Sequence, residues 1–122
     1  MRMLKFATVA LSLLVVCVKG YDEKFDKIDI DKVLKDDTLL TAYLNCFLDK
    51  GPCTEEYSSE YKEMLPEVMS DGCAKCTKIQ KENFKKVLKE VFENKKDVLM
   101  EIKKKYDRND EYDDNIRKIL SE

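Results

Sequence analysis

Apolar residues recur with a helical period through most of this chain, and the alternation typical of β-strands is missing. The first wide stripe consists of Leu39, Leu40, Tyr43, Leu44, Phe47 and Leu48. Residues spaced in this way share one face of a helix. The pattern therefore predicts a helix with Asp37 or Thr38 as its N-cap and the Gly-Pro pair at 51–52 as its end.

A second helix is expected to follow Thr54, whose hydroxyl can cap it, with Glu55 and Glu56 in the first turn. Its apolar face would consist of Tyr57, Tyr61, Met64, Leu65, Val68 and Met69. Because Pro66 lacks a backbone donor, we expect a kink or an early break before Gly72.

The third and longest helix is predicted from about Cys73 to Asn94, and its inward residues would be Ile79, Phe84, Val87, Leu88, Val91 and Phe92. Two shorter helices carry Val98, Leu99, Ile102 and Tyr106, and then Tyr112, Ile116, Ile119 and Leu120. Ahead of them all, residues 28–34 predict an extended arm that enters a single helical turn. The sequence thus predicts an all-α fold, a compact bundle of five to six helices.

The N-terminal residues have the three parts of a secretory signal peptide. Arg2 and Lys5 precede an apolar stretch over residues 6–18, and Gly20 offers a small residue for cleavage. That stretch is too short to cross a bilayer comfortably, which takes about 20 apolar residues. We expect a signal peptide over 1–20 and one secreted, extracellular domain over 21–122.

Four cysteines in that domain, Cys46, Cys53, Cys73 and Cys76, are typical of a disulfide framework in an exported protein. Three pairings are open, and pairing of neighbours is the simplest because the chain closes each pair locally. A redox pair at Cys73 and Cys76 would need a βαβ context, which is absent. A zinc site is disfavoured because the first two cysteines are too far apart for the usual knuckle.

The composition of the chain argues against several classes of function. The chain has no histidine, so Ser-His and Cys-His nucleophile pairs are excluded, and we expect a protein that is not an enzyme. Without residues 1–20 it carries 20 basic and 25 acidic residues, a formal charge of −5, which does not favour nucleic acid. Residues 107–118 resemble a calcium loop, but Tyr112 and Lys118 occupy its glycine and glutamate positions. We therefore expect no metal and no cofactor.

Several short stretches resemble the insect chemosensory proteins, the OS-D-like family. These stretches are 21–26 (YDEKFD), 28–34 (IDIDKVL), 46–54 (CFLDKGPCT), 65–67 (LPE), 72–76 (GCAKC), 80–82 (QKE), 93–95 (ENK) and 105–107 (KYD). The resemblance covers nearly all of residues 21–106. It implies six helices around a hydrophobic channel, two disulfides between neighbouring cysteines, and uptake of fatty-acid-like or odorant molecules.

The chain departs from the family at a few positions. Leu99 stands where the family commonly has a tryptophan, Phe84 lies where a small residue is usual, and Phe25 replaces a tyrosine. These differences are expected to reshape the channel. Tyr43 matches an inward-facing family tyrosine and is the first candidate for a polar contact to a guest.

The resemblance and the apolar stripes together lead to a carrier hypothesis. The candidate ligand contacts are Tyr43, Leu44, Phe47, Tyr61, Leu65, Met69, Val87, Val91, Leu99, Ile102, Tyr106 and Tyr112. Each of these residues could equally belong to a solid core. The rival hypothesis is a secreted helical protein that acts through its surface on a protein partner in development or in a host. We expect a monomer that binds a small hydrophobic ligand and has, as a further partner, a membrane receptor or another protein.

Overall fold

The computed structural model describes residues 20–122, which form one 3₁₀ helix and six α-helices and contain no strand. In chain order the elements are η1 (Glu23–Lys27), α2 (Ile30–Lys35), α3 (Asp37–Phe47), α4 (Ser58–Asp71), α5 (Lys78–Asn94), α6 (Lys96–Tyr106) and α7 (Asp113–Ser121). The predicted all-α class is confirmed. The predicted signal peptide, apart from Gly20, lies outside the described residues. Within residues 20–122, no helix combines the length and the apolar character that a bilayer span requires.

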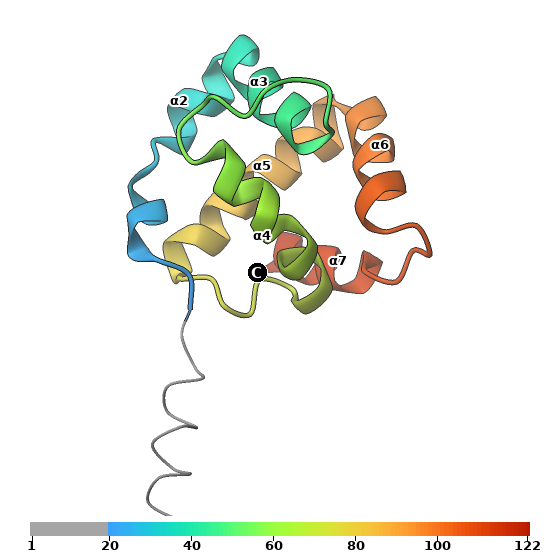
Figure 1. Ribbon diagram of the computed structural model, residues 1–122. Coiled ribbons are helices and arrows are strands. Elements are labelled where there is room, and N and C mark those ends of the chain that lie inside the picture. The colour runs from blue at the N-terminus through green and yellow to red at the C-terminus, as the bar shows by residue number, and fades with distance from the viewer. Residues whose placement is uncertain (1–19) are drawn as a thin grey trace, which may run out of the picture.

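The two longest helices, α4 and α5, form the centre of the bundle, and the shorter helices pack around them (Figure 1). α3, α6 and α7 contact α4, while η1, α2, α6 and α7 contact α5. Figure 1 shows α2 and α3 at one end of the bundle and α7 at the other. Because helices pack at both ends of the bundle and along one of its sides, α4 and α5 are kept apart. Side chains extend into the space between these two helices.

The buried side chains gather in two clusters. The first contains Val33, Leu40, Tyr43, Leu44 and Val91, so it joins α2, α3 and α5. The second contains Val68, Cys73 and Ile119, and joins α4, α7 and the loop before α5. Each cluster ties together segments that are distant in the sequence.

The α3 helix starts earlier than the sequence predicted. α3 begins at Asp37, and its N-cap is Asp36, whose carboxylate accepts a hydrogen bond from the Leu39 N–H at 3.2 Å. The helix ends at Phe47, before the predicted Gly-Pro stop. The arm expected over residues 28–34 contains α2, which stands where the single helical turn was predicted. The 3₁₀ helix η1 lies ahead of this arm and is capped by the carboxylate of Asp22.

The start predicted for the second helix was wrong. α4 begins at Ser58, and the preceding residue Tyr57 has a left-handed conformation with φ 59° and no side-chain cap. The Cys46–Cys53 disulfide holds the chain beside the end of α3, and a turn in which Ser58 N–H donates to the Glu55 carbonyl must follow before a helix can form. The helix then continues through Pro66 to Asp71, so of the two effects expected from Pro66, a kink or an early break, the break does not occur.

The predicted start of the third helix was wrong as well. α5 begins at Lys78, because the Cys73–Cys76 disulfide closes a turn in which Cys73 has a φ of 66°. Thr77 caps α5 in a reciprocal capping box, with Gln80 bonded back to the Thr77 N–H. Both disulfides therefore join neighbouring cysteines and determine where α4 and α5 begin.

Two residues predicted to face inward from α5 are exposed instead. Ile79 is 48% exposed and Phe92 is 37% exposed. At about 100° per residue, Ile79 lies roughly 140° and Phe92 roughly 80° around the helix from Phe84. The stripe that faces the core consists of Phe84, Val87, Leu88 and Val91.

Candidate functional site

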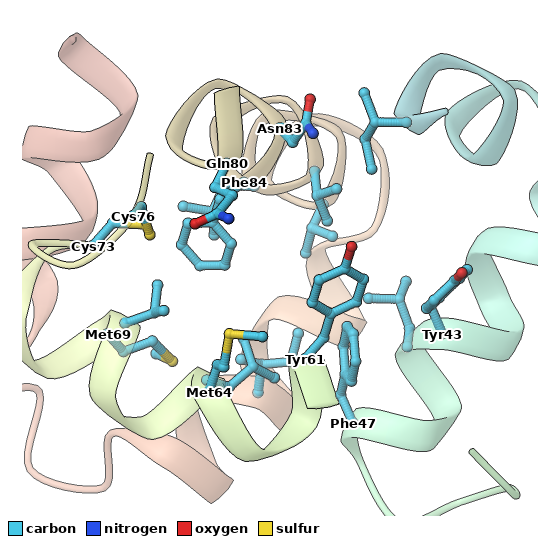
Figure 2. Close-up of a pocket in the computed structure, with 18 of the residues that line it drawn as sticks. Tyr43, Phe47, Tyr61, Met64, Met69, Cys73, Cys76, Gln80, Asn83 and Phe84 are labelled. Carbon is cyan, nitrogen blue, oxygen red and sulfur yellow. A yellow bond between two sulfur atoms is a disulfide. The ribbon is translucent and has the colours of Figure 1, made fainter. Parts of the chain in front are cut away.

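An apolar cavity of about 160 Å³ lies between α4 and α5, between the two core clusters (Figure 2). α4 lines it with Met64, Leu65, Val68 and Met69, and α5 with Phe84, Val87, Leu88 and Val91. Side chains of α2, α3 and α6 and of the N-terminal segment close the remaining sides. Almost the whole surface of the cavity is carbon, so it is suited to an apolar guest.

The structure brings most of the candidate ligand contacts together on this cavity. Those that line it are Tyr43, Leu44, Phe47, Tyr61, Leu65, Met69, Val87, Val91, Leu99 and Ile102. Tyr106 and Tyr112 do not line it. The Tyr106 hydroxyl donates to the Phe47 carbonyl at 2.5 Å, and Tyr112 is the N-cap residue of α7.

Other lining residues were not among the candidates. The N-terminal segment contributes Tyr21, Phe25, Ile28, Ile30 and Val33, and the disulfide between Cys73 and Cys76 also faces the cavity. Phe84 and Leu88 share the helical stripe of Val87 and Val91, so the period of α5 could have identified them. No local pattern could have placed the N-terminal segment there, because it reaches the cavity only through long-range packing.

A cluster of aromatic rings closes one end of the cavity. The Phe25 ring lies edge-on to Tyr57 at 5.1 Å between centroids and 5.6 Å from Tyr61. The Tyr43 ring lies 6.4 Å from both Tyr61 and Phe47. These separations fall in the range that favours edge-to-face and tilted aromatic contacts. The rings hold one another in place and fix where the tyrosine hydroxyls point.

The hydroxyl of Tyr43 is already engaged within the protein. It donates to the Glu56 carbonyl at 2.7 Å, and burial, with the nearby carboxylates of Glu55 and Glu56, raises the pKa of this phenol. The hydroxyl of Tyr61 differs, because it is buried and has no hydrogen-bond partner in residues 20–122. In Figure 2 it points across the cavity toward α5.

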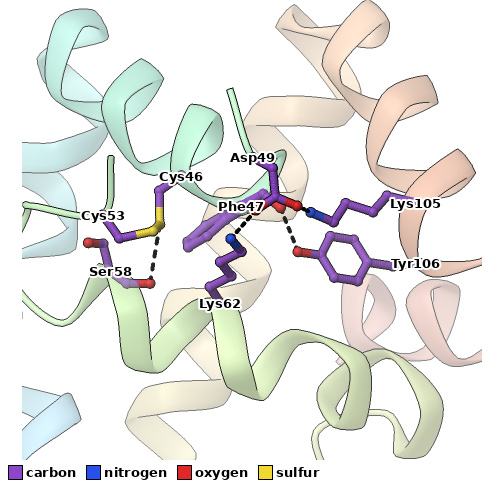
Figure 3. A network of polar contacts seen from close by, with 8 residues as sticks. All are labelled: Cys46, Phe47, Asp49, Cys53, Ser58, Lys62, Lys105 and Tyr106. Carbon is purple, nitrogen blue, oxygen red and sulfur yellow. Dashed lines mark hydrogen bonds and ion pairs between the residues drawn. A yellow bond between two sulfur atoms is a disulfide. The ribbon is translucent and has the colours of Figure 1, made fainter. Parts of the chain in front are cut away.

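A polar network outside the cavity joins three helices (Figure 3). Asp49, in the turn after α3, accepts hydrogen bonds from Lys105 of α6 and Lys62 of α4. These two ammonium groups lower the pKa of Asp49 to about 2. Beside them, Tyr106 bonds the Phe47 carbonyl, and the Cys46 sulfur lies 3.6 Å from the Ser58 carbonyl. The network therefore connects α3, α4 and α6 near the aromatic end of the cavity.

Three carboxylates converge where the loop after α6 meets the start of α7. They belong to Asp107, Asp110 and Asp113, within the stretch rejected as a calcium loop. The Lys103 ammonium pairs with Asp110 at 3.1 Å and with Asp113 at 3.0 Å. Asp107 accepts hydrogen bonds from backbone N–H groups of the turn that leads into α7. These contacts explain the cluster as a structural connection between α6 and α7.

Comparison with known proteins identifies similar chains over most of the sequence. The model of the insect pheromone-binding family A10/OS-D matches residues 21–114. Ejaculatory bulb-specific protein 3 of Drosophila melanogaster is 37% identical over 107 residues, which cover 87% of this chain and 84% of that protein.

Two solved structures have the same fold. A chemosensory protein in complex with bromo-dodecanol aligns with a TM-score of 0.72 and 30% identity, over 84% of this chain and 98% of that one. The antennal chemosensory protein A6 of the moth Mamestra brassicae aligns with a TM-score of 0.66 and 30% identity, over 83% of this chain and 93% of that one.

Proposed function

The chain belongs to the insect pheromone-binding family A10/OS-D, and we propose that it is a secreted, non-enzymatic carrier of small hydrophobic molecules. The guest occupies the cavity between α4 and α5. The observation that carries this proposal is the continuous apolar lining of that cavity, to which both central helices contribute. A relative of the same fold holds bromo-dodecanol, an apolar chain with one polar end, which supports the same type of guest here.

Binding would come from removing an alkyl chain from water, at about 0.8 kcal/mol per methylene. The cavity, about 160 Å³, is close in volume to an engineered apolar cavity of about 150 Å³ that admits benzene. A longer chain therefore has to displace side chains. Met64 and Met69 line the α4 wall, and their unbranched, flexible side chains can rearrange around guests of different shape.

Secretion is part of the proposal. The apolar stretch over residues 6–18 has the features of a signal peptide, and both cysteine pairs are disulfides, which persist in oxidising compartments. Expression in insect cells, followed by N-terminal sequencing of protein from the medium, would test this. A chain that starts at Tyr21 is expected, and retention of the full-length chain in the cells would contradict it.

The carrier function is tested by displacement of a fluorescent apolar probe from the oxidised mature protein. The competitors are alcohols, aldehydes, esters and acids with 10 to 18 carbons. Saturable displacement at one site per chain, with an optimum chain length, is the expected result. If folded, helical protein takes up no probe, the carrier function is refuted and the rival, a surface that binds a protein partner, takes its place.

A further inference from the structure

We propose that the hydroxyl of Tyr61 is the polar anchor of the cavity and that it selects uncharged guests carrying a hydrogen-bond acceptor. Such guests include long-chain alcohols, aldehydes and esters, and they are favoured over carboxylates. This inference rests on the proposed carrier function, and it assigns the chemical class of guest and the residue that recognises it.

The first argument is the unpaired donor. The Tyr61 hydroxyl is buried without a hydrogen-bond partner in residues 20–122, although the residue lines the cavity. The other two tyrosines on the cavity are engaged, since Tyr43 donates to the Glu56 carbonyl and Tyr21 donates to the Glu67 carboxylate at 3.0 Å. A buried polar group without a partner is destabilising. A guest whose oxygen accepts this O–H removes that penalty when it binds.

The second argument is preorganisation. The Tyr61 ring is packed against Phe25, Tyr43 and Tyr57, with centroid separations of 5.6, 6.4 and 6.2 Å. Rings held from several sides lose little freedom when a guest arrives, so the hydrogen bond costs little ordering. The hydroxyl points across the cavity toward α5 (Figure 2), where the apolar body of the guest would lie.

The third argument is the absence of a free cation facing the cavity from residues 20–122. The one lysine that lines it, Lys103, pairs through its ammonium with Asp110 and Asp113. Lys62 pairs with Asp49, and the ammonium of exposed Lys24 lies over the rings of Phe25 and Tyr57 at the aromatic end. A carboxylate guest would therefore be buried without a counter-ion, which is strongly unfavourable.

The charged groups near the Tyr61 hydroxyl also favour an uncharged guest. Burial raises the pKa of Tyr61, and the neighbouring Tyr43 and Tyr57 and the carboxylates of Glu56 and Glu60 raise it further. The phenol thus stays protonated and acts as a donor, while the two glutamates repel an anionic guest. A neutral acceptor oxygen satisfies the donor without either penalty.

The test compares two matched variants, Tyr61→Phe and Tyr106→Phe, each of which loses one hydroxyl. Tyr106 does not line the cavity. Competition with the fluorescent probe gives the affinities of 1-decanol, decanal, methyl decanoate and decane. In Tyr61→Phe, the three oxygen-containing guests are expected to bind about three- to tenfold more weakly, the effect of one neutral hydrogen bond. Decane should be bound equally well, which also shows that the variant is folded. In Tyr106→Phe, whose hydroxyl donates to the Phe47 carbonyl away from the cavity, all four affinities should match wild type.

Thermal unfolding of the guest-free proteins gives an independent readout. Tyr61→Phe removes an unpaired hydroxyl, so it should be at least as stable as wild type. Tyr106→Phe loses a hydrogen bond to the Phe47 carbonyl and should be less stable. The reverse order of stability would overturn the assignment of Tyr61 as the unpaired group.

Guest charge is tested at pH 8, where decanoate is ionised. Methyl decanoate should bind wild type at least tenfold more tightly than decanoate. The proposal is overturned if decanoate binds as well as the ester, or if Tyr61→Phe changes oxygen-containing guests and decane alike. If wild type binds decane but the Tyr61 hydroxyl has no effect, only this inference fails. If wild type binds none of the guests, the carrier function fails with it.

Discussion

Phe84 is the side chain whose removal should change the capacity of the cavity most directly. It projects from α5 into the space beside Met69 and the Cys73–Cys76 disulfide (Figure 2). Its ring is part of the cavity wall and also packs against the second core cluster. The substitution Phe84→Ala should therefore lower stability and enlarge the site at the same time.

The size of both effects follows from the cavity. Loss of the ring opens roughly 100 Å³, and at about 24 cal/mol per Å³ the added cavity alone costs about 2.4 kcal/mol of unfolding free energy. The lost burial of the ring adds to this cost. For a domain of this size, the melting temperature without guest should fall by at least about 10 °C. The new space admits about three more methylenes, each of which contributes about 0.8 kcal/mol when buried. Ordering of the longer chain offsets part of that gain.

The assay is probe displacement by a series of 1-alkanols with 8 to 18 carbons, on wild type and on Phe84→Ala. The optimum chain length should increase by about three carbons in the variant. Phe92→Ala is the control, because Phe92 lies on the same helix but is exposed and does not line the cavity. It should leave the optimum unchanged. If Phe84→Ala is destabilised as expected but keeps the wild-type optimum, the guest does not lie against Phe84 and the reasoning is refuted.

Two further predictions concern stability. The folded-state pKa of Asp49 is lowered to about 2 from 3.8, so the stability that its two lysine partners provide is complete above pH 4 and is lost as the pH falls toward 2. Between pH 5 and pH 2, the melting temperature of wild type should therefore fall more steeply than that of Asp49→Asn. Equal slopes for the two proteins would contradict this. Replacing Cys73 and Cys76 by serine, or Cys46 and Cys53 by serine, should each cost roughly 2 kcal/mol of unfolding free energy. Of the two pairs, Cys73 and Cys76 line the cavity and Cys46 and Cys53 do not. The loss of the Cys73–Cys76 disulfide should therefore also weaken guest binding, and equal affinities in the two double variants would argue against the site as described.

The helices that the sequence predicted best are those whose limits depend on local patterns. α6 and α7 lie where the stripes through Ile102 and Ile116 placed them. The starts of α4 and α5 were misplaced by three and about five residues, because the turns closed by the disulfides occupy positions where the apolar period would allow a helix. Ile79 was misassigned because an apolar residue at the start of a helix need not share the buried stripe.

In the candidate site, too, local features could be predicted from the sequence and long-range features could not. The stripes identified most of the cavity-lining residues of α3, α4 and α5, since a residue's position around its own helix is a local property. They could not distinguish core from cavity wall. That distinction depends on the separation of α4 and α5, which contacts with α3, α6 and α7 maintain.

By itself, the sequence determined the helical class, most of the apolar face that each helix buries, and the absence of histidine chemistry. The tertiary structure alone decided that the apolar faces leave a space between them, and that Tyr43 donates to Glu56 while the Tyr61 hydroxyl finds no partner within residues 20–122. The physical reason is the range of the interactions. Helical periodicity and capping act over a few residues, whereas a cavity and the partner of a buried hydroxyl depend on where distant segments of the chain come to lie.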